Sequence, residues 1–185
     1  LRSIFKYRLS SLINIAGLAV GLTCCLLIGL YVQHELSYDR FHDKADRIVR
    51  VTMNYNVQGN ENEVIVTGTK VLPAFKRNFP EVENGVRFFP IGAIVRKDDQ
   101  ILDEDGFVYA DSTFFEVFSF ELLQGNPKTA LENPNAVVLT ESTAKRYFGD
   151  ESPIGKVLQI NNSKDFEIAG IVQDPPANSQ IKFDF

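Results

Sequence analysis

Residues 9–33 read LSSLINIAGLAVGLTCCLLIGLYVQ, a run of 25 residues without a charged side chain. A helix rises about 1.5 Å per residue, so this run spans about 37 Å and exceeds the roughly 30 Å hydrocarbon core of a bilayer. We therefore predict a transmembrane helix over residues 11–34. A cleaved signal peptide is the alternative, but its apolar region is shorter, about 7–15 residues, and is followed by small residues at the cleavage site.

Charged residues are distributed unevenly about this run. Arg2, Lys6 and Arg8 precede it, whereas all 24 acidic residues and 16 of the 19 basic residues follow it, a net charge of −8. Lys and Arg favour the cytoplasmic side of a membrane. We therefore expect a cytoplasmic N-terminus in the cell inner membrane and a periplasmic location after about residue 34. A net acidic domain also disfavours nucleic acid as a partner.

Small residues recur at every fourth position of the apolar run. They are Gly17, Gly21, Cys25 and Gly29, and Asn14 lies near the same face. Small residues at this spacing let a second helix approach closely, and a buried Asn can add an interhelical hydrogen bond. The run therefore predicts a helix-packing face, with a chance distribution of glycine as the alternative.

The chain divides into four predicted parts. Residues 1–10 form an interfacial juxtamembrane segment, either a short surface helix or a basic tail, and residues 11–34 form the membrane helix. Residues 35–46 extend the helix and then break it, and residues 47–185 form one periplasmic core domain. The chain begins at Leu1 and ends at Phe185 without a terminal signal. We therefore expect it to be part of a larger membrane protein whose core is incomplete at the C-terminus.

The first half of the core domain predicts a strand, a hairpin, a helix and a strand. Apolar residues alternate with polar ones over residues 49–57, which predicts a half-buried strand, and a turn at residues 58–60 leads to a second strand at 63–67. A helix follows from Thr69 and stops at Pro80, and residues 82–89 return as a strand.

The second half is richer in hairpins. Residues 93–96 and 101–109 predict strands about a polar turn, and Asp111-Ser112 can cap a short helix that carries Phe114, Phe115 and Phe118. Residues 136–139 predict a short strand, and Thr140 caps the helix ESTAKRYF, which Gly149 ends. A last hairpin joins residues 157–160 and 166–172. The fold class is therefore α+β.

Three short motifs suggest chemistry, but each lacks its companions. Ser142 and Lys145 match the S-x-x-K pair of penicillin-binding enzymes without the S-D-N and K-T-G motifs, so a solvated helical turn is the better interpretation. The acidic stretch at residues 103–106 fails the calcium-loop register and predicts an acidic turn. The two histidines, with no cysteine outside the apolar run, do not make a zinc site. We therefore predict no catalytic residue, no metal ligand and no cofactor, and expect that the chain is not an enzyme.

Three stretches together carry a family resemblance. The first is residues 13–20, within NIAGLAVGL, together with the stretch HELSYDRFHDKADRIVRV at which the chain leaves the predicted membrane helix. The other two are residues 136–160 (AVVLTESTAKRYFGDESPIGKVLQI) and residues 166–185 (FEIAGIVQDPPANSQIKFDF). In this order the chain resembles the N-terminal part of MacB-type ABC transporter permeases, the group that shares the FtsX-like permease domain.

The resemblance implies a first membrane helix followed by a MacB-like periplasmic core that transmits movement. It implies an ABC ATP-binding subunit or domain as partner, a homodimer or heterodimer of permeases, and in MacB-like members a periplasmic adaptor. Such permeases export antimicrobial compounds or peptides, release lipoproteins or govern cell-wall hydrolases. No Walker motif is present in this chain, so ATP hydrolysis is expected in a partner or another domain.

Two other classes of protein remain open. An extracytoplasmic sensor domain of a membrane-anchored signalling protein also combines one helix with an α+β domain, and a membrane-anchored enzyme is disfavoured by the missing catalytic motifs. The number of membrane helices after residue 185 distinguishes a permease from a sensor.

Overall fold

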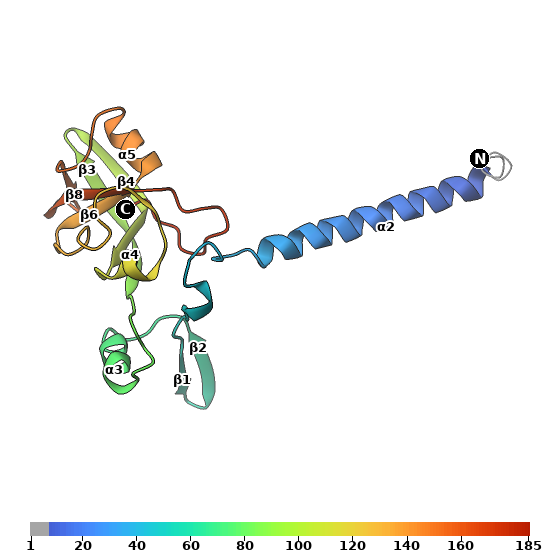
Figure 1. Cartoon of the computed structure of the whole chain (residues 1–185), viewed down its shortest axis with the longest axis horizontal. Coiled ribbons are helices and arrows are strands. Elements are labelled where there is room, and N and C mark those ends of the chain that lie inside the picture. Colours follow the sequence, from blue (N-terminus) through green and yellow to red (C-terminus); the bar gives the residue numbers. More distant parts are fainter. Residues whose placement is uncertain (1–7) are drawn as a thin grey trace. The chain divides into compact units, whose positions relative to one another are not determined.

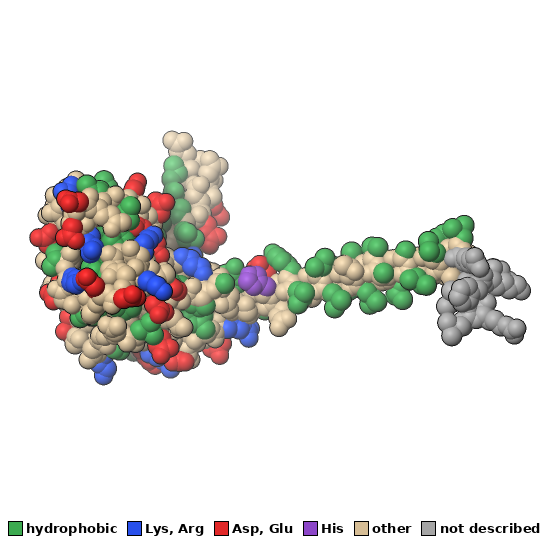
Figure 2. Space-filling model, turned by 90° about the horizontal axis from the view of Figure 1, so that it is seen from above, with side chains coloured by type: hydrophobic (Ala, Val, Ile, Leu, Met, Phe, Trp, Pro, Cys, Tyr) green, Lys and Arg blue, Asp and Glu red, His purple; other side chains and the backbone are tan. Residues whose placement is uncertain are grey.

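The computed structural model describes residues 8–185, which divide into two compact units at the boundary between Asp39 and Arg40 (Figure 1). The first unit consists mainly of the helix α2 (Arg8–Glu35). By length and composition, α2 can cross a membrane, and none of its apolar window is buried within the protein. Figure 2 shows hydrophobic side chains along its length. A helix that is apolar on all sides has no polar face to present to water.

The second unit is an α+β domain, as predicted. It begins with a single 3₁₀ turn and continues with eight strands and three short helices. In chain order these are η1 (Ala45–Arg47), β1 (Met53–Val57), β2 (Asn60–Val64), α3 (Val71–Asn78), β3 (Phe88–Lys97), β4 (Gln100–Ala110), α4 (Phe114–Val117), β5 (Leu122–Gln124), β6 (Ala136–Thr140), α5 (Glu141–Phe148), β7 (Val157–Ile160) and β8 (Lys164–Val172).

Six of the strands form the main sheet. Its order is β4-β3-β7-β8-β5, and β6 pairs with β8 in parallel, whereas the other pairings are antiparallel. Two tight turns hold the hairpins of this sheet: Asp98 has φ 51° in the β3–β4 turn, and Asn161 and Asn162 have φ 51° and 55° in the β7–β8 turn. Both hairpins were predicted, because Asp and Asn tolerate this left-handed conformation.

The last residues of the chain lie between β4 and β6. The Asp184 and Phe185 amides donate to the Gly106 carbonyl at 2.7 and 3.1 Å, and the Val108 amide donates to the Phe185 carbonyl at 3.0 Å. On the other side, the Thr140 amide donates to the Asp184 carbonyl at 3.0 Å. Backbone hydrogen bonds therefore link β4, β3, β7, β8, β6 and the C-terminal residues into a closed ring.

Two apolar clusters stabilise this domain. The sheet cluster gathers buried residues from β3, β4, β6, α5, β7 and β8, including Leu139, Leu158 and Ile168, which have no exposed surface. The aromatic cluster contains the buried side chains Phe114, Phe118, Phe120, Ala130, Val138, Val172 and Phe183.

The hairpin β1–β2 and the helix α3 lie apart from the main sheet (Figure 1) and contain no buried residue. The turn is as predicted: Gln58 and Gly59 have φ 53° and 88°, and the Gly59 amide donates to the Asn56 side chain at 2.9 Å. The strand predicted over residues 49–57 is confirmed only for residues 53–57, and the prediction that it is half-buried is wrong. Val49 is 82% exposed and β1 begins only at Met53, because a two-stranded ribbon offers no second layer to cover its apolar face.

Two further predictions need correction. Residues 82–87 do not form a strand, and β3 begins at Phe88. Residues 103–106 are not a turn but the middle of β4, where the pairing register shifts between the pairs Ala93–Glu104 and Ile91–Phe107. This β-bulge places an extra residue in β4, which locally bends the strand.

Candidate functional site

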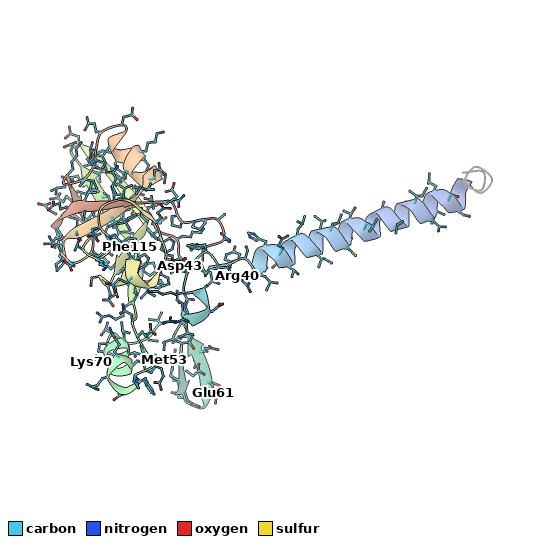
Figure 3. The ribbon with its side chains drawn as sticks, viewed as in Figure 1. Arg40, Asp43, Met53, Glu61, Lys70 and Phe115 are labelled. Carbon is cyan, nitrogen blue, oxygen red and sulfur yellow. The ribbon has the colours of Figure 1, made fainter. Side chains whose placement is uncertain are left out.

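The candidate functional site is the place where the chain that follows α2 joins the domain. We call residues 40–48 the junction segment; it begins five residues after Glu35. The Asp43 amide donates to Ser119 Oγ at 2.9 Å, and Lys44 Nζ donates to the Glu116 carbonyl at 2.8 Å. Figure 3 marks Arg40 and Asp43 in this segment and Phe115 in α4. These bonds connect residues 72 to 76 positions apart in the sequence.

His42 is the buried centre of the junction segment. Its side chain is 5% exposed, and its ring lies 5.2 Å from the ring of Phe118 and 5.1 Å from that of Phe120. Its Nδ1 atom accepts a hydrogen bond from the Ser119 amide at 3.1 Å. This hydrogen bond orients the imidazole ring toward the backbone of Ser119. The sequence offered only a weak signal for this role, namely an apolar neighbour, Phe41, and no metal-ligand partner.

Two apolar neighbours extend the contact. The Phe41 ring lies 5.5 Å from the Phe120 ring, and Ile48 packs against the same aromatic cluster. Aromatic pairs at such distances add to the stabilisation that burial provides. The junction segment is therefore held by apolar packing as well as by hydrogen bonds.

A second set of polar contacts holds residues 83–87, which lead from α3 to β3. Asn84 donates to the Glu116 carboxylate at 3.0 Å, and Thr113 Oγ1 donates to the Gly85 carbonyl at 2.8 Å. Arg47 of the junction segment forms an ion pair with Glu83. The region around α4 therefore binds both the junction segment and the connection to the β1–β2 and α3 elements.

Arg87 and Asp111 form the best-defined ion pair of this region. Arg87 Nε and its amide both donate to Asp111 Oδ2 at 2.9 Å, and Nη2 donates to Oδ1 at 2.7 Å. The hydrogen bonds from Arg87 lower the pKa of the Asp111 carboxyl group. The predicted capping role of Asp111 is wrong in its detail: its carboxylate binds Arg87, and its backbone carbonyl accepts from the Phe114 amide at the start of α4.

The predicted helix-packing residues all lie on α2. Asn14, Gly17, Gly21, Cys25 and Gly29 are exposed, and a Cβ atom added to any of the three glycines would meet no atom within 4 Å beyond its chain neighbours and the backbone of the helix itself. Each step of four residues turns about 40° beyond a full helical turn, so the stripe winds slowly around the helix. Its packing role stays a prediction, and residues 1–7 of the predicted interfacial segment lie outside the described residues.

The short motifs that suggest chemistry in the sequence make structural contacts in the fold. Ser142 Oγ donates to Asp174 Oδ1 at 2.8 Å at the start of α5. Glu104, from the acidic stretch, is 6% exposed and accepts from Tyr147 and Arg146. Within residues 8–185, no group of three His, Cys, Asp or Glu side chains is arranged to hold a metal ion. These polar side chains therefore attach one segment of the domain to another. Within the described residues they form no metal site.

One known protein family matches most of the chain. The sequence profile of the MacB-like periplasmic core domain matches residues 11–185. The chain belongs to this family. No curated protein sequence matches the chain.

Solved structures are similar to this MacB-like core domain. A domain described as belonging to a permease from Porphyromonas gingivalis shares 26% identity at a TM-score of 0.57, over 68% of this chain and 54% of that chain. The periplasmic region of MacB from Actinobacillus actinomycetemcomitans shares 24% identity at a TM-score of 0.42, over 48% and 42% of the two chains. The extracellular domain of the transporter YknZ from Gram-positive bacteria shares 18% identity at a TM-score of 0.40, over 48% of each chain. The chain thus spans about half the length of these structures.

Proposed function

We propose that the chain is the first membrane helix and part of the periplasmic core of an ABC transporter permease, and that it transmits ATP-driven movement between the membrane and the periplasm. ATP hydrolysis belongs to an ABC subunit or domain, and this chain carries no catalytic step. The permease works as a dimer, with a cytoplasmic N-terminus in the inner membrane. Export of peptides or antimicrobial compounds with a periplasmic adaptor, and release of lipoproteins, are the candidate tasks.

One observation carries this proposal: the junction segment is bound firmly to the domain within a few residues of α2. Three backbone or side-chain hydrogen bonds and the buried His42 hold it against residues 116–120. The stretch between Glu35 and Arg40, LSYD, contains no glycine. A short connection without a flexible Gly/Ser linker passes displacement on, whereas a flexible linker absorbs it.

A linker insertion tests the transmission. We expect that four Gly/Ser residues inserted between Asp39 and Arg40 of the full-length permease leave its ATPase activity intact and abolish its transport phenotype. The matched control is the same insertion between Asp98 and Asp99, two exposed residues in the β3–β4 turn. Normal transport with the linker between Asp39 and Arg40 would contradict the proposal.

A reporter fusion tests the orientation. A reporter that is active only in the cytoplasm, fused after Asp46, should be inactive, since Arg2, Lys6 and Arg8 favour a cytoplasmic N-terminus. Strong reporter activity would place the domain on the cytoplasmic side.

A further inference from the structure

An asparagine that directly precedes a glycine lies in the connection between α3 and β3. The pair is Asn84 and Gly85, within the stretch EVENGVRFF at residues 81–89, and both residues are half-buried. Asparagine is chemically labile. In an Asn-Gly pair the glycine nitrogen attacks the side-chain amide carbon with least hindrance, because glycine has no side chain. No other asparagine in the sequence is followed by glycine.

The packing of this connection explains the glycine at position 85. A Cβ atom there would overlap the Leu72 Cδ1 atom of α3. On its other side, the Gly85 carbonyl accepts a hydrogen bond from Thr113 Oγ1 at 2.8 Å. Gly85 is therefore held between α3 and the residue that precedes α4, which fixes the position of its peptide group.

Three hydrogen bonds hold the Asn84 side chain. Its Oδ1 atom accepts from the Gly85 amide at 2.9 Å and from Lys76 Nζ at 3.3 Å. Its Nδ2 atom donates to the Glu116 carboxylate at 3.0 Å. Two donors at one end of the amide and an acceptor at the other end are compatible with this orientation of the amide alone.

These contacts place reactive groups around one carbon atom, Asn84 Cγ. The hydrogen bond from the Gly85 amide to Oδ1 folds the side chain back over the peptide, so the attacking nitrogen lies beside Cγ. The Lys76 ammonium group faces the oxygen on which negative charge develops during the attack. The Glu116 carboxylate contacts the nitrogen that leaves and is placed to relay a proton to it.

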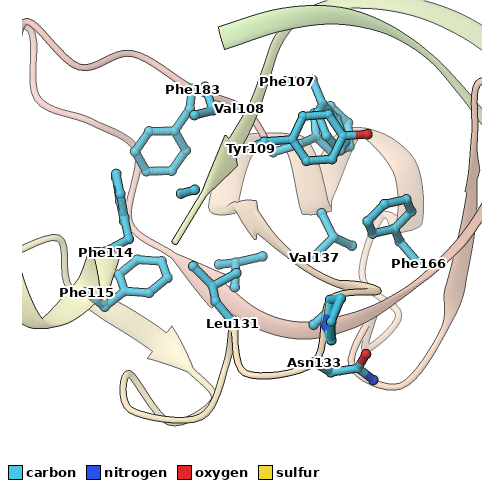
Figure 4. Close-up of a pocket in the computed structure, with 15 residues that line it drawn as sticks. Phe107, Val108, Tyr109, Phe114, Phe115, Leu131, Asn133, Val137, Phe166 and Phe183 are labelled. Atoms are coloured by element: carbon cyan, nitrogen blue, oxygen red, sulfur yellow. The ribbon is translucent and has the colours of Figure 1, made fainter. Parts of the chain in front are cut away.

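The two assisting side chains come from different helices. Lys76 belongs to α3 and Glu116 to α4, and both residues are exposed, so water reaches the site. Next to Glu116, Phe114 and Phe115 line an apolar pocket (Figure 4), and Phe114 is only 3% exposed. The apolar side of α4 is therefore anchored in the domain, which holds Glu116 in place beside Asn84.

We propose that Asn84 deamidates spontaneously in the folded protein, assisted by Lys76 and Glu116. The Gly85 nitrogen loses its proton and bonds to Asn84 Cγ, the bond between Cγ and Nδ2 breaks, and ammonia leaves with that proton. Water then opens the resulting succinimide ring. Hydrolysis of the bond between Cγ and the Gly85 nitrogen gives aspartate, and hydrolysis of the main-chain bond between the two residues gives isoaspartate.

The product changes what this connection binds. A carboxylate at position 84 has no N–H to donate to Glu116, and two carboxylates at hydrogen-bonding distance repel each other. Lys76 instead gains a negatively charged partner. Deamidation therefore weakens the attachment of residues 83–87 to α4 and strengthens their attachment to α3. This inference does not depend on the proposed role in transmission.

Mass spectrometry of the full-length permease tests the reaction. The protein is kept at neutral pH in water enriched in heavy oxygen and is then digested. We expect the peptide that contains residue 84 to take up one heavy oxygen atom and to separate into an aspartate and an isoaspartate form. The reference is the free peptide of residues 81–89, which has the Asn-Gly pair but neither Lys76 nor Glu116. The folded protein should convert faster than this peptide, and slower conversion would overturn the proposal.

Two substitutions test the assisting residues. Lys76→Met and Glu116→Gln should each slow the conversion by about threefold, the size of effect that one exposed charge provides. Lys70→Met is the matched control, because Lys70 is an exposed lysine immediately before α3 and should leave the rate unchanged. If Lys76→Met and Glu116→Gln both convert as fast as the unmodified protein, neither side chain assists and the proposal fails.

Discussion

Glu104, in the middle of β4, accepts a hydrogen bond from the Tyr147 hydroxyl group of α5 at 2.7 Å. Arg146 donates to the other carboxylate oxygen at 2.9 Å. Glu104 and Tyr147 are 6% and 4% exposed. Burial, and then the hydrogen bond to Glu104, raise the pKa of the Tyr147 hydroxyl, which therefore stays protonated and acts as a donor. This contact attaches α5 to the sheet.

Tyr147→Phe should destabilise the domain by about 1–3 kcal/mol, because it leaves a buried carboxylate oxygen without its donor. The free energy of unfolding in urea measures the effect. Tyr55→Phe, at a tyrosine that is 43% exposed in β1, is the control and should change stability by less than about 0.5 kcal/mol. Equal effects of the two changes would show that the Tyr147 hydroxyl contributes nothing.

The ion pair between Arg87 and Asp111 should make stability depend on pH. Hydrogen bonds from Arg87 lower the pKa of Asp111 in the folded state. The stabilisation is therefore fully present above the ordinary aspartate pKa of about 3.9 and is lost as the pH falls through the lowered value. Asp111→Asn should reduce stability at pH 7 and flatten the acid limb of a plot of melting temperature against pH. An unchanged acid limb would contradict this assignment.

Gly106 should tolerate no side chain. A Cβ atom there would lie 2.5 Å from Asp184 Oδ2 and 2.8 Å from its Cγ atom. Gly106→Ala should therefore displace the C-terminal residues from β4 and lower the melting temperature. Gly92→Ala is the matched control, since its Cβ atom would meet its nearest neighbour at 3.7 Å. Faster amide hydrogen exchange at Val108, which binds Phe185, should accompany the first change and not the second.

The small-residue stripe of α2 predicts a contact with another membrane helix. Gly21→Leu should hold the two backbones apart and impair assembly or transport, whereas Leu22→Ile, one position further round the helix, should have little effect. Membrane level and transport activity of both full-length variants provide the measurement. If Gly21→Leu equals the unmodified protein in both, the stripe arises by chance and α2 faces lipid.

The local sequence was sufficient to predict an element where the residues that determine its boundaries lie within or beside it. Thr140 accepts from the Thr143 amide at the start of α5, and Gly149 ends that helix with φ 59°, both as predicted. The helix α3 also begins near Thr69 and ends before Pro80 as predicted. In each case a cap, a glycine or a proline determines the helix boundary from within a few residues, so the neighbouring residues are sufficient to predict it.

Prediction failed where the partner lies far along the chain. The acidic stretch at residues 103–106 has the composition of a turn, but Glu104 finds its donors 42 and 43 positions later and lies in a strand. The alternation over residues 49–57 has the period of a half-buried strand, but the structure brings no second layer to it. His42 had no recognisable motif, because its contacts with Ser119 and Phe118 exist only in the folded domain.

The amino-acid sequence by itself determined the apolar helix, the α+β class, the tight turns and the family resemblance, because uncharged length, periodicity and turn residues are local properties. Only the tertiary structure decided that the junction segment is bound to residues 116–120 and that a ring of strands is closed by Asp184 and Phe185. These features depend on pairs of residues that are distant in sequence. Many pairs of sequence positions could come into contact. The folded chain adopts those pairs that bury apolar surface and satisfy backbone hydrogen bonds at the same time.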